Sequence, residues 1–222
     1  MIDLKLTSEE ISDVIQIGID RQFDWKVKNW TNKLEKQFHV FVLEDMCHSQ
    51  ISRGYIFEKV KSFDSLNKKE TNDYMRLFTQ VMVWGFASSG YGPYRTNKFL
   101  SKNINHEFIK NGFDYCFVGE FEKSFKEFNK IEGLGISFIS KLIYFAAKDS
   151  HPDTYPLIFD IQVVRSLLGT FSNDLLSLVE VMPKSNYKSY KLYRDIISEN
   201  AIRYNIEADL IECILYDRQA HK

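Results

Sequence analysis

A short turn with two glycines, set between two segments of helical periodicity, constrains the fold of this chain more than any other feature. The turn is Ile131-Glu132-Gly133-Leu134-Gly135, and Ile136-Ser137-Phe138 opens the segment that follows it. Glycine adopts positive φ angles readily and lets another group approach the backbone closely. The pattern therefore predicts two helices joined as a hairpin. A turn that only packs two helices together is the alternative interpretation.

The rest of the chain also favours helices. Its 222 residues include only 10 Gly and 4 Pro, which is little material for the tight turns of a β-sandwich or barrel. Apolar spacing predicts helices at about 50–62, 70–86, 94–112, 118–130, 136–148, 160–169, 173–181, 186–203 and 206–218. No repeat or linker divides the sequence. We therefore predict an all-α fold with a single domain, residues 1–222.

The N-terminal helix has its own start signal. Thr7 and Glu10 are spaced as a capping box, in which each side chain accepts a hydrogen bond from the other residue's backbone amide. Gly18 predicts that the helix weakens or ends nearby. Apolar residues at helical spacing predict one buried face, made of Ile11, Val14, Ile15 and Ile19.

The charge balance limits which kinds of DNA-binding protein the chain can be. The formal net charge of −1, from 29 basic and 30 acidic residues, speaks against a protein that coats DNA regardless of sequence, but it permits one local basic face. The residues considered for that face are Lys98, Lys102, Lys110, Lys184, Lys188, Lys191 and Arg194, and a solvated helix surface is the alternative.

Three separated cysteines without a CxxC motif indicate reduced thiols. No apolar run approaches the length of a membrane span and no secretion signal is evident, so we expect a soluble cytoplasmic monomer. The five histidines are scattered, and we predict no metal site.

The segment after the turn carries several polar side chains at one helical spacing. They are Ser137, Ser140, Lys141, Tyr144 and Lys148. A loop containing Pro156 follows, and the apolar triplet 157–159 leads to Asp160 at the predicted start of the next helix. Free amides at the start of the 136–148 helix, together with its dipole, would bind a phosphate oxygen.

In this order of features the chain resembles the helix-hairpin-helix DNA glycosylases, and particularly the bacterial branch similar to 8-oxoguanine DNA glycosylase. The fragments that carry the resemblance are Gly133-Leu134-Gly135, Ser140-Lys141 and Pro156 to Asp160, with Ser52-Arg53-Gly54, Trp84-Gly85, the Gly90-to-Arg95 turn and Glu212. The resemblance implies two helical lobes flanking a cleft, with the hairpin and catalytic core at about 118–170. It also implies a DNA partner, and a monovalent cation at the hairpin as the one accessory ion.

The resemblance assigns roles to two residues of the core. Asp160 would stabilise an oxocarbenium ion or activate the nucleophile, whereas an N-cap for the following helix is the plainer interpretation. Lys141 would be a Schiff-base nucleophile, or else a solvated lysine. The family places its lysine where this chain has Ser137, which would position water or contact phosphate. Helical side chains lean toward the N-terminus, so Lys141 would reach back over Ser137.

A glycosylase turns its target base out of the duplex, and the pocket that receives the base needs aromatic side chains to stack against it. Trp84, Tyr91 and Tyr94 are the residues considered for that pocket, with Arg95 as a phosphate or base contact, although most aromatic side chains serve the core. The favoured hypothesis is excision of 8-oxoguanine or another altered base, including a modified base in phage DNA. A non-catalytic DNA-binding hairpin module and a protein-interaction scaffold are the alternatives.

Overall fold

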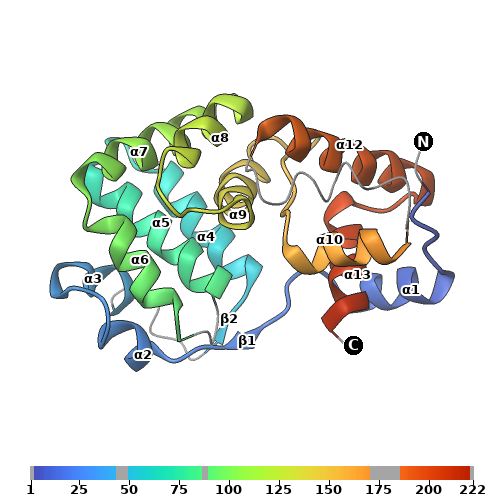
Figure 1. The fold of residues 1–222 in the computed structure, drawn as a ribbon, viewed down its shortest axis with the longest axis horizontal. Coiled ribbons are helices and arrows are strands. Elements are labelled where there is room, and N and C mark those ends of the chain that lie inside the picture. The colour runs from blue at the N-terminus through green and yellow to red at the C-terminus, as the bar shows by residue number, and fades with distance from the viewer. Residues whose placement is uncertain (1–2, 44–49, 87–89, 171–185, 221–222) are drawn as a thin grey trace.

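The predicted fold class is confirmed. The computed structural model describes residues 3–43, 50–86, 90–170 and 186–220, and within these ranges every regular element is a helix apart from one small antiparallel sheet (Figure 1). That sheet pairs β1 (Phe23–Asp24) with β2 (Gln50–Ile51), with Phe23 opposite Ile51. The prediction of helix from residue 50 was therefore too early, since the helix begins at Arg53.

The helices of the described residues are, in chain order, α1 (Ser8–Ile17), α2 (Val27–Thr31), the 3₁₀ turn η1 (Lys36–Phe38), α3 (Val40–Leu43), α4 (Arg53–Asp64), α5 (Thr71–Phe86), α6 (Gly92–Leu100), α7 (Asn103–Phe117), α8 (Phe121–Asn129), α9 (Ile136–Ala147), α10 (Ile161–Thr170), α12 (Tyr187–Tyr204) and α13 (Ala208–Ala220). The predicted helix at 173–181 lies outside the described residues. None of the described helices is long and apolar enough to cross a membrane.

The helices form two groups with α9 between them (Figure 1). Helices α2 to α8 lie on one side, and α4, α5, α7 and α8 pack against α9. On the other side, α1, α10 and α12 pack against α13. The N-terminal helix thus joins the group made from the end of the chain, and the segment between α1 and β1 runs from one group to the other.

Helix α9 is buried over almost its whole length. Every residue from Ile139 to Ala147 is buried, including Ser140, Lys141 and Tyr144. The polar side chains at helical spacing therefore do not form a solvated face. Buried polar groups need hydrogen-bond partners, and these side chains face the second group of helices, where the candidate site lies.

The single helix predicted at 94–112 is in fact two helices. Helix α6 ends at Leu100 and α7 begins at Asn103. The Asn105 side chain donates a hydrogen bond of 2.8 Å to the Phe99 carbonyl, and His106 Nε2 lies 2.6 Å from the Leu100 carbonyl. These side chains bond the last carbonyls of α6, which explains why a continuous apolar pattern contains a break.

The start of α1 agrees with the sequence, but its buried face only in part. Both hydrogen bonds of the Thr7–Glu10 capping box are present, and the helix ends at Gly18, whose φ is 71°. Val14 is buried, whereas Ile15 is 57% exposed. Helix α1 packs against α13 at the edge of its group, so α13 covers a narrower face of α1 than the apolar spacing predicts.

Candidate active site

The predicted helical hairpin is formed by α8, the turn at 130–135 and α9. Gly133 has a φ of 84°, a conformation that strains any residue with a β-carbon, so glycine is strongly favoured there. The Leu134 amide donates to the Ile131 carbonyl at 3.0 Å, and the buried Leu134 side chain anchors the turn. Gly135 is extended and precedes the first turn of α9, whose leading amides have no acceptor within the helix.

Lys141 reaches back along α9 as its helical position predicts. Its Nζ lies 2.7 Å from Ser137 Oγ and 3.3 Å from the Ser137 carbonyl. The residue is only 5% exposed, so the interpretation as a solvated lysine is wrong. The amine of Lys141 thus lies beside Ser137, one turn earlier on the same helix.

Asp160 meets Lys141 from the other group of helices. Its Oδ2 lies 2.7 Å from Lys141 Nζ and accepts a 3.0 Å hydrogen bond from Ser137 Oγ. Its Oδ1 accepts a 3.2 Å hydrogen bond from the Gln162 amide at the start of α10. The carboxylate therefore serves as a helix cap with one oxygen and as the partner of Lys141 with the other.

The surroundings of Asp160 keep it ionised. Burial by itself would raise the pKa of this carboxyl, but the positive charge of Lys141 and the hydrogen bonds from Lys141, Gln162 and Ser137 outweigh it and lower the pKa to about 2. A carboxylate remains at neutral pH in a largely dry setting, where its field acts strongly on a nearby cation.

The backbone before Asp160 is held on both sides. Ser140 Oγ accepts a 2.9 Å hydrogen bond from the Phe159 amide, and a Glu212 oxygen accepts one of 2.8 Å from the Ile158 amide. The Tyr193 hydroxyl donates to the Ile158 carbonyl at 2.8 Å. Helices α9, α12 and α13 thus fix the residues that carry Asp160, which limits how far its carboxylate can move.

Glu212 also belongs to a buried ion pair. Arg53 Nη2 lies 2.7 Å from Glu212 Oε1, and Arg53 Nη1 donates to the Tyr144 hydroxyl at 3.2 Å. Tyr144 in turn donates to Asp209 at 3.0 Å. Burial raises the pKa of the Glu212 carboxyl, while Arg53 and the Ile158 amide act in the opposite direction. This network ties α4, α9 and α13 together.

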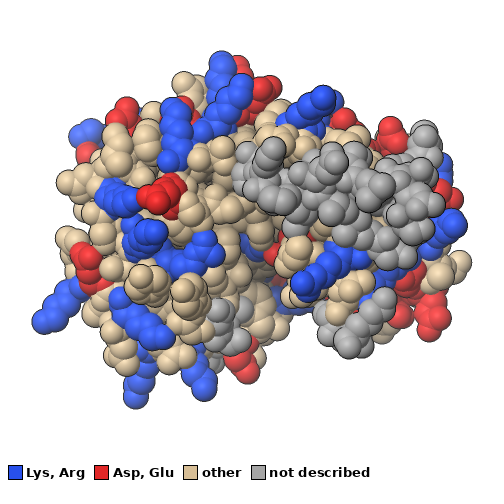
Figure 2. All heavy atoms as spheres, in the orientation of Figure 1, with Lys and Arg blue, Asp and Glu red and all other residues tan. Residues whose placement is uncertain are grey.

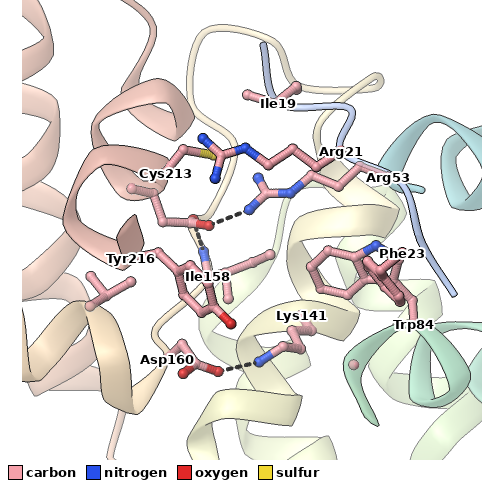
Figure 3. Close-up of a pocket in the computed structure, with 13 residues that line it drawn as sticks. Ile19, Arg21, Phe23, Arg53, Trp84, Lys141, Ile158, Asp160, Cys213 and Tyr216 are labelled. Carbon is pink, nitrogen blue, oxygen red and sulfur yellow. Dashed lines mark hydrogen bonds and ion pairs between the residues drawn. The ribbon is translucent and has the colours of Figure 1, made fainter. Parts of the chain in front are cut away.

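A cavity of about 330 Å³ opens beside the pair (Figure 3). It is lined by Ile19, Arg21, Phe23, Arg53, Trp84, Gly85, Lys141, Ile158, Asp160, Val163, Glu212, Cys213 and Tyr216. The lining comes from both groups of helices and from the N-terminal segment between them. A volume of a few hundred Å³ is in the range that encloses a small planar ligand.

Of the residues predicted for a base pocket, Trp84 lines this cavity and the other three do not. Tyr91 and Tyr94 are 65% and 61% exposed, with their ring centres 5.8 Å apart. Arg95 donates a hydrogen bond to the Gly133 carbonyl and so braces the hairpin from α6. The start of α6 therefore contacts the hairpin through Arg95 and contributes no side chain to the cavity lining.

The sequence did not single out several residues that line the cavity. Arg21, Phe23, Cys213 and Tyr216 belong to no recognisable motif, and the resemblance is weak in the first fifty residues. Arg53 and Glu212 were noted as fragments of the resemblance without a role. Their charge at buried helical positions was the available signal, since a buried charge requires a partner.

Lysine and arginine side chains stand around α6 and the hairpin on the face shown in Figure 2, but acidic side chains accompany them. Lys102 pairs with Glu132 at 2.7 Å, Lys110 with Asp114 at 3.1 Å, and Lys191 with Asp195 at 3.0 Å. Lys98 is exposed beside the hairpin, and Lys184 lies outside the described residues. The local positive charge is therefore modest, as the overall balance indicates.

The hairpin gives little support for the monovalent cation that the resemblance implies. The Gly133 carbonyl already accepts a hydrogen bond from the Arg95 guanidinium, and the Ile131 carbonyl accepts one from Leu134. A cation at the Gly133 carbonyl would be repelled by the charge of Arg95. The described residues also contain no cluster of His, Cys, Asp and Glu suited to a metal ion.

The helical hairpin and the buried lysine–carboxylate pair both fall within the part of the chain that matches a known family. Residues 18–216 match the family described as "Putative 8-oxoguanine DNA glycosylase OGG-like protein". The chain belongs to this family, and the match begins after α1, ends within α13 and includes all the residues that line the cavity. No curated protein and no solved structure matches the chain.

Proposed function

We propose that this protein excises a base from DNA, with Lys141 and Asp160 as the reacting groups. The observation that carries the proposal is the ion pair of 2.7 Å between them, which faces a cavity just beyond the hairpin. Both groups are held by hydrogen bonds to other elements, so neither needs to reorganise before reaction. Such preorganisation is the main source of electrostatic stabilisation in enzymes.

Asp160 would act on the sugar. When the bond between C1′ and the base nitrogen lengthens, its electron pair moves to the base and C1′ acquires positive charge. An ionised carboxylate fixed near that carbon stabilises the charge, and the low pKa of Asp160 keeps it ionised. The departing base takes a proton from solvent or from the site.

Lys141 would supply the nucleophile. A neutral amine forms a bond to C1′ as the base leaves, and breaking the C1′–O4′ bond then gives an iminium ion, with O4′ taking a proton. Attack requires that the ammonium first loses a proton. Asp160 Oδ2, 2.7 Å from Nζ, would take this proton and pass it to solvent, so that the carboxylate is ionised again when C1′ becomes positive. Ser137 Oγ, also 2.7 Å from Nζ, accepts a hydrogen bond and orients the amine.

The hairpin would hold the DNA strand. The leading amides of α9 and the positive end of its dipole favour a phosphate oxygen, and exposed Gly135 leaves room for one to approach. Tyr91 and Tyr94 are exposed beside the hairpin, so we assign them to contacts with the duplex and not to the base cavity. Contacts of this kind position DNA without reading its sequence.

The test is single-turnover base release from duplex oligonucleotides that each carry one altered base. The wild-type protein should release a base from at least one duplex, and Asp160→Asn should slow this by roughly 100-fold or more. Asp195→Asn is the matched control, because it removes a carboxylate from an exposed pair with Lys191. Salt-sensitive binding to every duplex without any release would instead identify a non-catalytic DNA-binding module.

A further inference from the structure

The cavity has a second polar wall, opposite the Lys141–Asp160 pair. Arg21 comes from the segment between α1 and β1, and its guanidinium is held by both carboxylate oxygens of Asp217 in α13, with Nη2 at 2.7 Å from Oδ2. Asp217 does not line the cavity, so it supports Arg21 from behind. In Figure 3, Arg21 extends over the cavity toward Cys213, on the side away from Asp160.

Two hydrogen-bond donors in the lining have no acceptor. Arg21 Nε and Trp84 Nε1 are both buried and unpaired within the part of the chain that the structure describes. A buried N–H without an acceptor is unfavourable in a folded protein, so two of them on residues that line one cavity call for an explanation. By contrast, the lining residues Lys141 and Asp160 are bonded to each other, as are Arg53 and Glu212.

Aromatic faces stand on two sides of the same space. The rings of Phe23 and Trp84 lie 6.0 Å apart on one side, and Tyr216 faces them from α13 (Figure 3). A planar heterocycle is the ligand that such faces stack against. The two buried donors without an acceptor, Arg21 Nε and Trp84 Nε1, belong to residues of this lining.

The charges of the lining also select among ligands. Three cationic side chains, Arg21, Arg53 and Lys141, face the cavity with two carboxylates, Asp160 and Glu212. Asp217 balances the charge of Arg21 only from behind the lining, so a cationic alkylated base in the cavity would lie closer to the guanidinium than to its carboxylate partner. A base that presents carbonyl oxygens would find N–H donors, and its departing electron pair would be stabilised by the guanidinium.

We infer that Arg21 and Trp84 form the wall that reads the extrahelical base, and that the base accepted is one whose exposed edge carries a carbonyl oxygen. This inference rests on the proposed function, since it names the substrate class of the same cavity. Arg21 is then a specificity-determining residue supplied by the N-terminal segment, and Asp217 is its positioning residue. Trp84 contributes both a stacking face and a donor.

The test measures binding without requiring catalysis. Fluorescence anisotropy is used to compare duplexes whose target nucleotide carries a 2′-fluorine, which destabilises the oxocarbenium ion and prevents excision. The target bases are 8-oxoguanine and uracil, which carry carbonyls, and 1,N6-ethenoadenine, which carries none. The full-length wild type should prefer one of the carbonyl-bearing duplexes over the ethenoadenine duplex and the unmodified duplex.

Arg21→Met should reduce that preference by roughly 10-fold or more, since the lost bond involves a charged donor, while affinity for unmodified duplex stays the same. Trp84→Phe keeps an aromatic face but removes the N–H, and it should reduce the preference less than Arg21→Met does. Arg218→Met is the matched control, because it breaks a similar pair with Glu10 outside the cavity lining. It should leave the preference unchanged.

Full preference in Arg21→Met, or equal wild-type affinity for all the duplexes, would overturn the inference. Preference for ethenoadenine would overturn it as well. These outcomes differ from failure of the proposed function: a wild type that discriminates through Arg21 but releases no base reads the base without excising it.

Discussion

The coupling between Lys141 and Asp160 makes a quantitative prediction about stability and pH. The pKa of Asp160 is lowered from its ordinary value of 3.8 to about 2 in the folded protein. One pKa unit corresponds to about 1.36 kcal/mol, so ionised Asp160 contributes roughly 2.5 kcal/mol to the free energy of unfolding at neutral pH. Asp160→Asn removes this contribution, because asparagine does not titrate.

The sign follows from the direction of the pKa change. A carboxyl whose pKa is lower in the folded state stabilises the protein above its unfolded pKa, and that stability is lost as pH falls toward the folded pKa. The difference in unfolding free energy between wild type and Asp160→Asn should therefore be greatest at pH 6. It should shrink by roughly 1 kcal/mol by pH 3 and continue to fall toward pH 2.

Urea denaturation followed by tryptophan fluorescence at several pH values between 3 and 6 measures this difference. Asp195→Asn is the control, since its exposed pair with Lys191 is screened by solvent and contributes little. A difference for Asp160→Asn that stays constant across this range would refute the reasoning. It would mean that Lys141 does not hold the Asp160 carboxylate in the folded protein.

Three further predictions concern the supporting structure. Arg53→Met should lower the free energy of unfolding by about 3–5 kcal/mol in urea melts, because Glu212 would stay buried without its cation; an unchanged midpoint would contradict the network. Gly133→Ala should cost about 1–2 kcal/mol from its φ of 84°, whereas Gly135→Ala, with an ordinary φ of −79° and open space around it, should cost little. Exchange of potassium for tetramethylammonium at equal ionic strength should leave duplex affinity unchanged, because Arg95 bonds the Gly133 carbonyl; a large loss would indicate a bound ion.

The elements with strong local signals were predictable from sequence. The Thr7–Glu10 capping box, the glycine turn before α9 and the position of Asp160 at the start of α10 each follow from interactions within a few residues. The reach of Lys141 over Ser137 was predictable for the same reason, because it is a property of one helix.

Features that depend on tertiary contacts were not predictable in this way. The break between α6 and α7 comes from the side chains of Asn105 and His106 bonding carbonyls six residues earlier, within a continuous apolar pattern. Arg21 enters the cavity because α13 presents Asp217, which is 196 positions away in the chain. Periodicity carries no information about such pairings, so Arg21 was missed, whereas Trp84 was predicted for the pocket and lines the cavity.

Borohydride trapping tests the central claim most directly. The wild-type protein is incubated with a duplex carrying a base that it releases, borohydride is added, and the adduct is mapped by mass spectrometry of peptides. We expect a reduced covalent bond between DNA and Lys141, formed by hydride addition to the iminium ion, and no adduct with Lys141→Met. Base release by the wild-type protein without any adduct would contradict the assignment of Lys141 as the nucleophile. An adduct at another lysine would contradict it as well.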